Sequence, residues 1–284
     1  MSALFHSYLC ARKASEWLII MRKVQCYFSP TGGTRRVAEL LVRGWGSQAD
    51  AWEAVDLSKP GEAEKIGALS VGDVCIAAVP VFGGRIPAPA AAALRKLCGN
   101  GARAVAAAVY GNRAYEDALL ELKDALEEAG FCCIAGITAV AQHSIIHEVA
   151  AGRPDARDEE QLAGFAAAVR ALLEKGRPGV LRVPGNRPYK EYRVSSMAPR
   201  TTEACIKCGQ CAGTCPVGAI PPDAPNTTDA AACISCMRCV AVCPQKARYI
   251  EAPLRETLAG KLAKACPARK DNELFLAEQA GPVD

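Results

Sequence analysis

Apolar residues in the first 176 positions gather in short runs that are separated by stretches with helical spacing. The runs cover residues 24–28, 51–57, 74–79, 102–110 and 131–140. The run at 74–79 is unbroken, as in a strand covered on both faces. The intervening stretches predict helices at 35–45, from after residue 87 to about residue 97, at 115–129 and at 158–175. This alternation predicts parallel β-α-β units and an α/β fold with a doubly wound, five-stranded parallel sheet.

The remaining chain has a different organisation. Prolines mark residues 177–200 as a linker: Pro178, Pro184, Pro188 and Pro199. We expect a first domain at 21–176, a second at 201–250, and a C-terminal helix and tail at 251–284. A strand begins directly after Met21, so we expect Met21 to be the natural start and residues 1–20 to be an N-terminal extension.

The second domain contains the pattern C-x2-C-x2-C-x3-C-P twice. The first copy is Cys205, Cys208, Cys211 and Cys215, and the second is Cys233, Cys236, Cys239 and Cys243. This is the spacing of bacterial two-cluster ferredoxins, in which the fourth cysteine of each copy ligates the other cluster. The predicted ligands are Cys205, Cys208, Cys211 and Cys243 for one [4Fe–4S] cluster, and Cys233, Cys236, Cys239 and Cys215 for the other.

Zinc and disulfides are the alternatives for these cysteines. Zinc sites use two separated cysteine pairs, which leaves the third cysteine and the repeat unexplained. Disulfides are not expected, because the chain shows no export signal. About fifty residues bury too little apolar surface to be stable alone, so we expect cluster insertion and folding to be coupled.

Composition narrows the class of protein further. At 284 residues the chain predicts about two domains. A net charge of +4 without a basic block gives no nucleic-acid footprint, and no apolar run reaches the roughly 18 residues of a membrane span. Cys26, Cys75, Cys132 and Cys133 lie in apolar runs and are expected to be free thiols. Reduced thiols and oxygen-sensitive clusters favour a cytoplasmic location.

Three loops follow strands that meet at the switch point of such a sheet, where ligands bind. They are residues 29–34, 80–87 and 111–115. In the first loop, Ser29, Thr31 and Thr34 offer hydroxyl groups, and Gly32 and Gly33 let backbone N–H groups approach an anion at a helix N-terminus. The loop is not a Walker A motif, since no lysine follows. A tight turn would explain this loop alone, but all three loops together favour a monophosphate such as FMN.

The loops also resemble those of flavodoxins. Ser29-Pro-Thr-Gly-Gly-Thr34 resembles the phosphate loop T-x-T-G-x-T, and Gly111-Asn-Arg-Ala-Tyr115-Glu resembles the third loop G-D-x-x-Y-E. The resemblance implies a flavodoxin-like sheet of order 2-1-3-4-5, with Tyr115 stacked on the flavin and Phe82 as the inner aromatic. The flavin contacts it implies in the loop 80–87 and in and just before the loop 111–115 are Val81, Phe82, Gly83, Gly84, Tyr110, Gly111, Asn112, Arg113 and Tyr115.

Residues 21–275 as a whole are similar to the flavodoxin–ferredoxin fusion proteins of anaerobic bacteria and archaea. The phrases typical of that group are Val-Pro-Val-Phe-Gly-Gly-Arg-Ile-Pro, Tyr-Gly-Asn-Arg and His143-Ser144. Two features depart from carrier flavodoxins: the chain is basic, and Asn112-Arg113 replaces an acidic start of the third loop. A positive charge near the flavin would stabilise its anionic reduced form and raise its potential.

Three weaker signals concern charged residues. His143 and His147 follow the fifth strand and suggest proton delivery, although a capping or solvent-exposed pair is the simpler interpretation. Arg85 is a candidate contact for a substrate anion or a partner. The linker cations predict a solvated segment or a dock for an acidic carrier: Arg177, Arg182, Arg187, Lys190 and Arg193.

These observations predict an electron-transfer protein that carries two [4Fe–4S] clusters and FMN and links one-electron and two-electron redox proteins. One alternative is a flavin-dependent reductase of a small organic acceptor such as a quinone. Another is a flavin-free ferredoxin whose first domain only docks a partner. The sequence holds no separate nicotinamide fingerprint.

Overall fold

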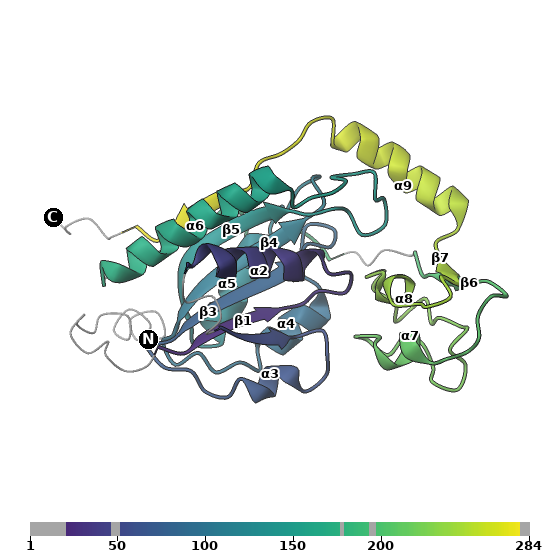
Figure 1. The fold of residues 1–284 in the computed structure, drawn as a ribbon, viewed down its shortest axis with the longest axis horizontal. Helices are drawn as coiled ribbons and strands as arrows, with labels where there is room; N and C mark the ends of the chain where they lie inside the picture. Colours follow the sequence, from purple (N-terminus) through teal and green to yellow (C-terminus); the bar gives the residue numbers. More distant parts are fainter. Residues whose placement is uncertain (1–20, 47–51, 177–178, 193–196, 279–284) are drawn as a thin grey trace.

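The computed structural model describes residues 21–46, 52–176, 179–192 and 197–278. The predicted extension at 1–20, together with Arg177 and Arg193, lies outside these residues. The chain folds into an α/β domain and a small cysteine-rich domain beyond one end of its sheet (Figure 1).

The sheet has the strand order β2-β1-β3-β4-β5-β8. Its strands are β1 (Lys23–Tyr27), β2 (Trp52–Asp56), β3 (Val74–Pro80), β4 (Arg103–Tyr110), β5 (Cys132–Val140) and β8 (Glu273–Leu276). The first five are parallel in the order 2-1-3-4-5, so the predicted flavodoxin-like sheet is confirmed. The sixth strand was not predicted: β8 pairs antiparallel with β5 and comes from the expected tail.

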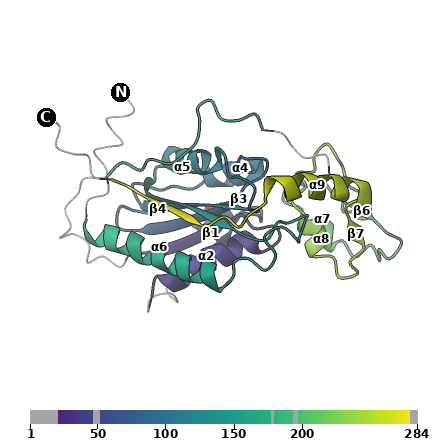
Figure 2. The same cartoon turned by 90° about the horizontal axis from the view of Figure 1, so that it is seen from above.

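Helices cover both faces of this sheet (Figure 2). One face carries α2 (Gly33–Gly44) and α6 (Ala156–Glu174), and the other α3 (Glu62–Lys65), α4 (Ala88–Leu94) and α5 (Ala118–Glu128). Successive residues of a strand therefore enter different cores: in β3, Ile76 packs on the α2 side and Ala77 on the α5 side. Because both faces are covered, both positions must be apolar, which explains the unbroken apolar runs.

The cysteine-rich domain is an internal repeat. Its elements are β6 (Arg200–Thr201), α7 (Gln210–Gly213), α8 (Arg238–Ala241) and β7 (Arg248–Tyr249). The two copies share unusual backbone: φ is +53° at Lys207 and +52° at Ser235, and +77° at Gly209 and +62° at Met237. From this domain, α9 (Ala252–Ala265) leads back to β8, so the repeat is inserted between α6 and the last strand of the sheet (Figure 2).

Free thiols are present in the sheet, with one exception to the prediction. Cys26, Cys75 and Cys133 are buried and free. Cys132 is disulfide-bonded, so the expectation of a free thiol is wrong there. None of the helices in the described part of the chain has the length and apolar character of a membrane span.

Candidate functional site

Two spaces in the cysteine-rich domain are each lined by four cysteines. The cysteines of the first space, the outer set, are Cys205, Cys208, Cys211 and Cys243. The cysteines of the second, the inner set, are Cys215, Cys233, Cys236 and Cys239. In each set three cysteines come from one copy of the repeat and the fourth from the other, so the structure brings together the residues that the spacing grouped.

The donor chemistry of both sets fits an iron–sulfur cluster. Within the described ranges, no three His, Cys, Asp or Glu side chains are arranged to hold a single metal ion. The cysteines surround a shared space instead. Backbone N–H groups donate to four of the sulfur atoms, at 3.3–3.4 Å: Lys207 to Cys205, Ser235 to Cys233, Ala219 to Cys215 and Ala247 to Cys243. Such bonds stabilise charge on a ligating thiolate.

The two sets differ in their exposure. In the inner set, Cys233 and Cys236 are each 9 % exposed, and Ile234 packs against a core cluster of the α/β domain. In the outer set Cys211 is also buried, at 8 %, but Cys208 is exposed and Ile206 is 64 % exposed. The inner set therefore meets the sheet at Ile234, and the outer set reaches solvent at Cys208.

A cavity of about 300 Å³ lies between the carboxyl end of the sheet and the cysteine-rich domain. Its size is in the range of small-molecule sites. The predicted flavin contacts that line it are Thr31, Gly33, Thr34, Val81, Phe82, Gly83, Tyr110, Gly111 and Arg113. All three switch-point loops thus contribute to one cavity.

The first loop leaves an anion site open at the start of α2. Gly32, with φ of +93°, is the N-cap residue and offers no capping side chain, and a Cβ there would meet nothing within 4 Å. Ser29 does not line the cavity: its buried hydroxyl accepts the N–H of Arg35 at 3.0 Å. Ser29 thus takes one N–H of the first turn and leaves those of Gly33 and Thr34 for a phosphate, so the residues present fit FMN.

Other predicted contacts do not line the cavity. Gly32 and Gly84 are absent from its wall. The side chain of Asn112 donates to the carbonyl of Ala268 at 2.9 Å and accepts the N–H of Lys270 at 3.0 Å. Asn112 therefore fastens the third loop to the C-terminal segment.

The predicted stacking of Tyr115 on the flavin does not match its position. Tyr115 packs edge-on against Tyr110 with ring centroids 5.6 Å apart. Burial and a hydrogen bond with Glu273 raise the pKa of its hydroxyl. The aromatic side chains on the cavity wall are Phe82, Tyr110 and Tyr192.

His143 lines the cavity as a fixed neutral donor. Its Nδ1 accepts the N–H groups of Ile145 (3.2 Å) and Ile146 (3.0 Å). Burial, with smaller contributions from His147 and Arg113, lowers the pKa of His143 to about 4. With Nδ1 occupied, the proton resides on Nε2. This matches the capping interpretation and removes the chemical basis for proton delivery near neutral pH.

Arg85 lies away from the cavity and holds the linker. Its guanidinium pairs with Glu121 at 2.7 Å and lies 4.8 Å from the ring centroid of Tyr189. The linker cations are not simply solvated: Arg187 pairs with Asp124 and Lys190 with Glu116, both at 2.6 Å. Arg85 is therefore occupied as a structural anchor, and these two cations are occupied as well.

Sequence reasoning did not place a further group of residues at the cavity. They are Gln142, Ser144, Ile145, Tyr192, Met197, Ile234, Ser235, Cys236, Leu258 and Leu262. Two of them carried a signal, Ser144 in the phrase His143-Ser144 and Cys236 as a predicted cluster ligand. Gln142, Ser144 and Ile145 directly follow β5, and the others reach the cavity through docking of the linker, the cysteine-rich domain and α9.

One ion pair joins the two domains directly. Arg238, the first residue of α8, pairs with Asp56 at 3.4 Å and also donates to Ser58. The two charged side chains are 11 % and 16 % exposed. Arg238 lies between Cys236 and Cys239, so this contact fixes the inner set against the end of β2.

Fold and site together define a two-part redox protein, a flavodoxin-like α/β domain joined to an iron–sulfur domain. Residues 204–247 match the family described as the 4Fe-4S dicluster domain. These two parts support a role in electron transfer. None of the curated proteins matches the chain.

Solved flavodoxins resemble about half of the chain. The flavodoxin of Streptococcus pneumonia is 16 % identical, with 53 % of this chain and 98 % of that chain covered and a TM-score of 0.39. Oxidised flavodoxin 2 of Bacillus cereus is 15 % identical, with 53 % and 99 % covered and a TM-score of 0.40. Two-electron reduced flavodoxin of Megasphaera elsdenii is 21 % identical, with 51 % and 98 % covered and a TM-score of 0.35. The strand order, not these scores, defines the fold.

Proposed function

We propose that this protein transfers electrons between two [4Fe–4S] clusters and an FMN, and so links one-electron and two-electron redox proteins. The outer set would hold one cluster and the inner set the other. The observation that carries the proposal is that Cys236, a member of the inner set, lines the same cavity as the three flavodoxin-like loops.

When bound, the clusters exchange single electrons and FMN exchanges one or two. Around the cavity, Thr31, Thr34 and the N–H groups that begin α2 would hold the phosphate. Phe82 and Tyr110 offer flat apolar faces, and Nε2 of His143 is a fixed donor. Arg113 adds a positive charge, reduced by its pair with Glu116 at 3.0 Å.

The wall opposite the sheet favours a carrier over a reductase of a small acceptor. Tyr192, Ile234, Leu258 and Leu262 line the cavity from the linker, the inner set and α9. These side chains occupy the region where an acceptor would have to approach. Transfer through the inner set needs no such opening.

The first test is anaerobic purification with iron, sulfide and flavin counts. We expect about eight irons and one FMN per chain. About eight irons without flavin after FMN reconstitution would reject the proposal and leave a ferredoxin on a docking domain.

A matched pair of variants tests the route. Cys236→Ala removes an inner ligand and Cys208→Ala the corresponding outer ligand. After photoreduction, flavin and cluster absorbance should equilibrate in wild type and in Cys208→Ala, but not in Cys236→Ala. Equal loss in both variants, with flavin and the other cluster retained, would contradict the assigned order.

A further inference from the structure

The loop after the first cysteine of the repeat occurs twice in the structure. One copy packs against the α/β domain, and the other is exposed to solvent. Residues 206–209 and 234–237 follow the first cysteine of each repeat. Their backbones agree closely, with φ of +53° at Lys207 and +52° at Ser235. In both loops this residue donates its N–H to the preceding cysteine sulfur at 3.4 Å. The two loops therefore present their side chains in the same way to whatever lies opposite.

The loop at 234–237 makes a docking contact within the molecule. Ile234 packs against the apolar core of the α/β domain, and Ile234, Ser235 and Cys236 line the flavin cavity. An isoleucine, its neighbour and a cluster cysteine thus form the contact through which the inner set meets its redox neighbour. Arg238 fixes that contact from the side at Asp56.

The loop at 206–209 repeats this arrangement on the surface. Ile206 occupies the position of Ile234 and is 64 % exposed, and Lys207 and Cys208 are exposed as well. Single exposed apolar residues are common, but this one lies beside a cluster cysteine at a position that its copy uses for docking. The geometry of the second loop indicates what the first is suited to meet: an apolar patch beside a redox centre.

The charges around the loop at 206–209 indicate the charge of the partner. The charged residues that line the space of the outer set are Lys207 and Arg248, and no carboxylate shares that wall. Arg248 is 3 % exposed and bonded within the domain, so the cation presented to a partner there is Lys207. Lys246, which follows Cys243, is exposed nearby. Ser235 takes the place of Lys207 in the internal copy, so the positive charge is specific to the exposed loop. An apolar centre with a cationic rim is complementary to an acidic protein surface.

We propose that residues 206–209, with Lys246, form the docking surface for an acidic one-electron carrier protein of the iron–sulfur class. This inference rests on the proposed function. It assigns the outer-set cluster as the one that exchanges electrons with an external carrier. In each encounter one electron leaves the reduced carrier and enters the outer-set cluster, or the reverse. Two of the linker cations do not compete for this role, since Arg187 pairs with Asp124 and Lys190 with Glu116.

The test measures the bimolecular rate of electron transfer from a reduced, acidic bacterial 2[4Fe–4S] ferredoxin. Lys207→Glu and Ile206→Ser alter the proposed surface. The matched controls are Lys175→Glu, an exposed cation at the C-cap of α6, and Val180→Ser, another exposed apolar residue. Helix α6 covers the sheet, and the cysteine-rich domain lies beyond one end of that sheet (Figure 1). Isothermal titration with the oxidised ferredoxin gives the affinity without turnover.

At low ionic strength we expect Lys207→Glu to slow the reaction about tenfold, and the difference from wild type to shrink as salt screens the charges. Ile206→Ser should weaken binding about fivefold at any salt, because it removes apolar contact. Lys207→Gln should fall between wild type and Lys207→Glu. Both controls should stay within about twofold of wild type.

Equal slowing by Lys207→Glu and Lys175→Glu would overturn the inference, since net charge alone would then explain it. Full rates in Ile206→Ser and Lys207→Glu would overturn it as well. Iron and flavin counts and internal equilibration after photoreduction are measured without the carrier. Normal results there with an unaffected carrier rate reject the docking surface alone, whereas abnormal results in wild type reject the proposed function.

Discussion

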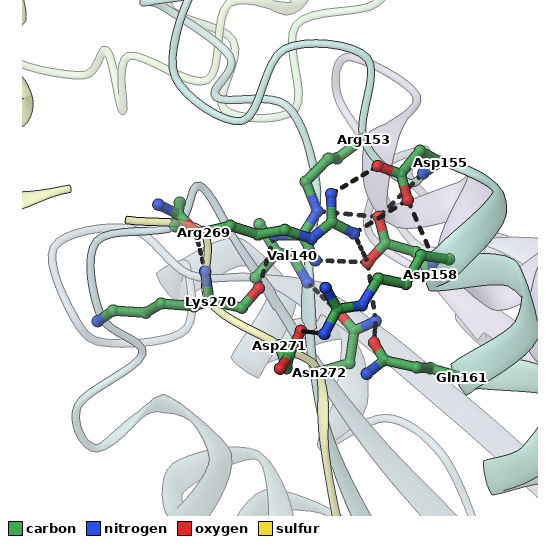
Figure 3. A network of polar contacts seen from close by, with 11 residues as sticks. Val140, Arg153, Asp155, Asp158, Gln161, Arg269, Lys270, Asp271 and Asn272 are labelled. Carbon is green, nitrogen blue, oxygen red and sulfur yellow. Dashed lines mark hydrogen bonds and ion pairs between the residues drawn. The ribbon is translucent and has the colours of Figure 1, made fainter. Parts of the chain in front are cut away.

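Two segments connect the cysteine-rich domain to the sheet, and they are fastened differently. The linker, residues 179–192, lies along α5. There Asp117 accepts the N–H groups of Asn186 (2.8 Å) and Lys190 (2.6 Å), and Asp124 pairs with Arg187. The return segment, residues 266–276, adds a strand to the sheet. Just before that strand, Arg269 and Asn272 join a polar network with a buried centre (Figure 3).

The centre of that network is Asp158, which is 0 % exposed. It accepts hydrogen bonds from Arg153, from Arg269 at 3.0 Å and from Asn272 at 3.0 Å. Asn272 in turn accepts the N–H of Val140 at 2.9 Å, three residues before His143. The return segment therefore lies behind the cavity and holds the end of β5 through Val140, whereas the linker runs over the surface along α5 and reaches the cavity with Tyr192.

This difference indicates which connection determines where the inner set lies. Breaking a buried charge pair leaves an uncompensated charge and costs much, whereas exposed pairs contribute little. The return segment also includes the end of the α9 connection, and α9 supplies Leu258 and Leu262 to the cavity. We therefore expect its loss to disturb the site more than loss of the linker contacts.

Removing iron should have the largest effect. It should unfold the cysteine-rich domain and leave both connecting segments bound to the α/β domain. Anaerobic chelation should unfold residues 200–250, because their core is the two clusters. Amides of 186–190 and of β8 should stay protected in hydrogen exchange, since their partners lie in the α/β domain. Simultaneous loss of protection in β8 would show that the return segment depends on the clusters.

The second largest effect should come from Asp158→Ala. It strands Arg153 without its buried partner, and we expect a loss of about 3–5 kcal/mol in the stability of the α/β domain. Hydrogen exchange should rise in β8 and at Val140, and FMN should bind more weakly. Unchanged exchange in β8 with a lower melting temperature would place the cost in α6 instead.

Acid should loosen the return segment in the same way. Arg269 above all holds the pKa of Asp155 well below its usual range. Burial raises the pKa of Asp158, but the hydrogen bond from Arg153 and further donors outweigh it, so this pKa is lowered as well. Folded-state pKa values that are depressed give stability above the unfolded value of about 3.9, which is lost as pH falls further. Exchange in β8, measured between about pH 5 and pH 2, should therefore rise only below about pH 4. A rise already above pH 5 would contradict this assignment.

Asp117→Ala tests the linker and should cost less. Asp117 is 2 % exposed and accepts three hydrogen bonds from Asn186 and Lys190, so about 1.5–3 kcal/mol is expected. Exchange should rise at 186–190 and remain normal in β8. A larger loss than in Asp158→Ala would reverse the comparison.

Sequence patterns predict the sheet, the cysteine sets and the contacts of the linker better than the return segment. Unbroken apolar runs determine a covered parallel sheet, and cysteine spacing alone groups the two sets. β8 has only four residues, too few to establish a period. The linker contacts could have been predicted, because Asp117 at the N-cap of α5 and Glu121 and Asp124 within it recur at i, i+4 and i+7 and form an acidic face for a basic segment.

The position of Tyr115 could not be predicted from its motif. The third loop has the flavodoxin-like order of residues, but Asn112 binds the return segment and Tyr115 turns toward Glu273 of β8. Both contacts are made with the return segment, more than 150 positions away. The cavity wall from Tyr192 and Leu262 depends likewise on how two distant segments dock, which no local pattern contains.

The smallest effect should come from Asp271→Asn, within the same network as Asp158. Asp271 pairs with Arg157 at 2.9 Å, but the two side chains are 51 % and 61 % exposed. Solvent already screens this pair, so we expect a change of about 0–1 kcal/mol and normal exchange in β8. The variant removes a charge from the same segment that Asp158 holds, which makes it the matched control for burial. A loss comparable to that of Asp158→Ala would mean that total charge in the network, and not burial of its centre, fastens the return segment.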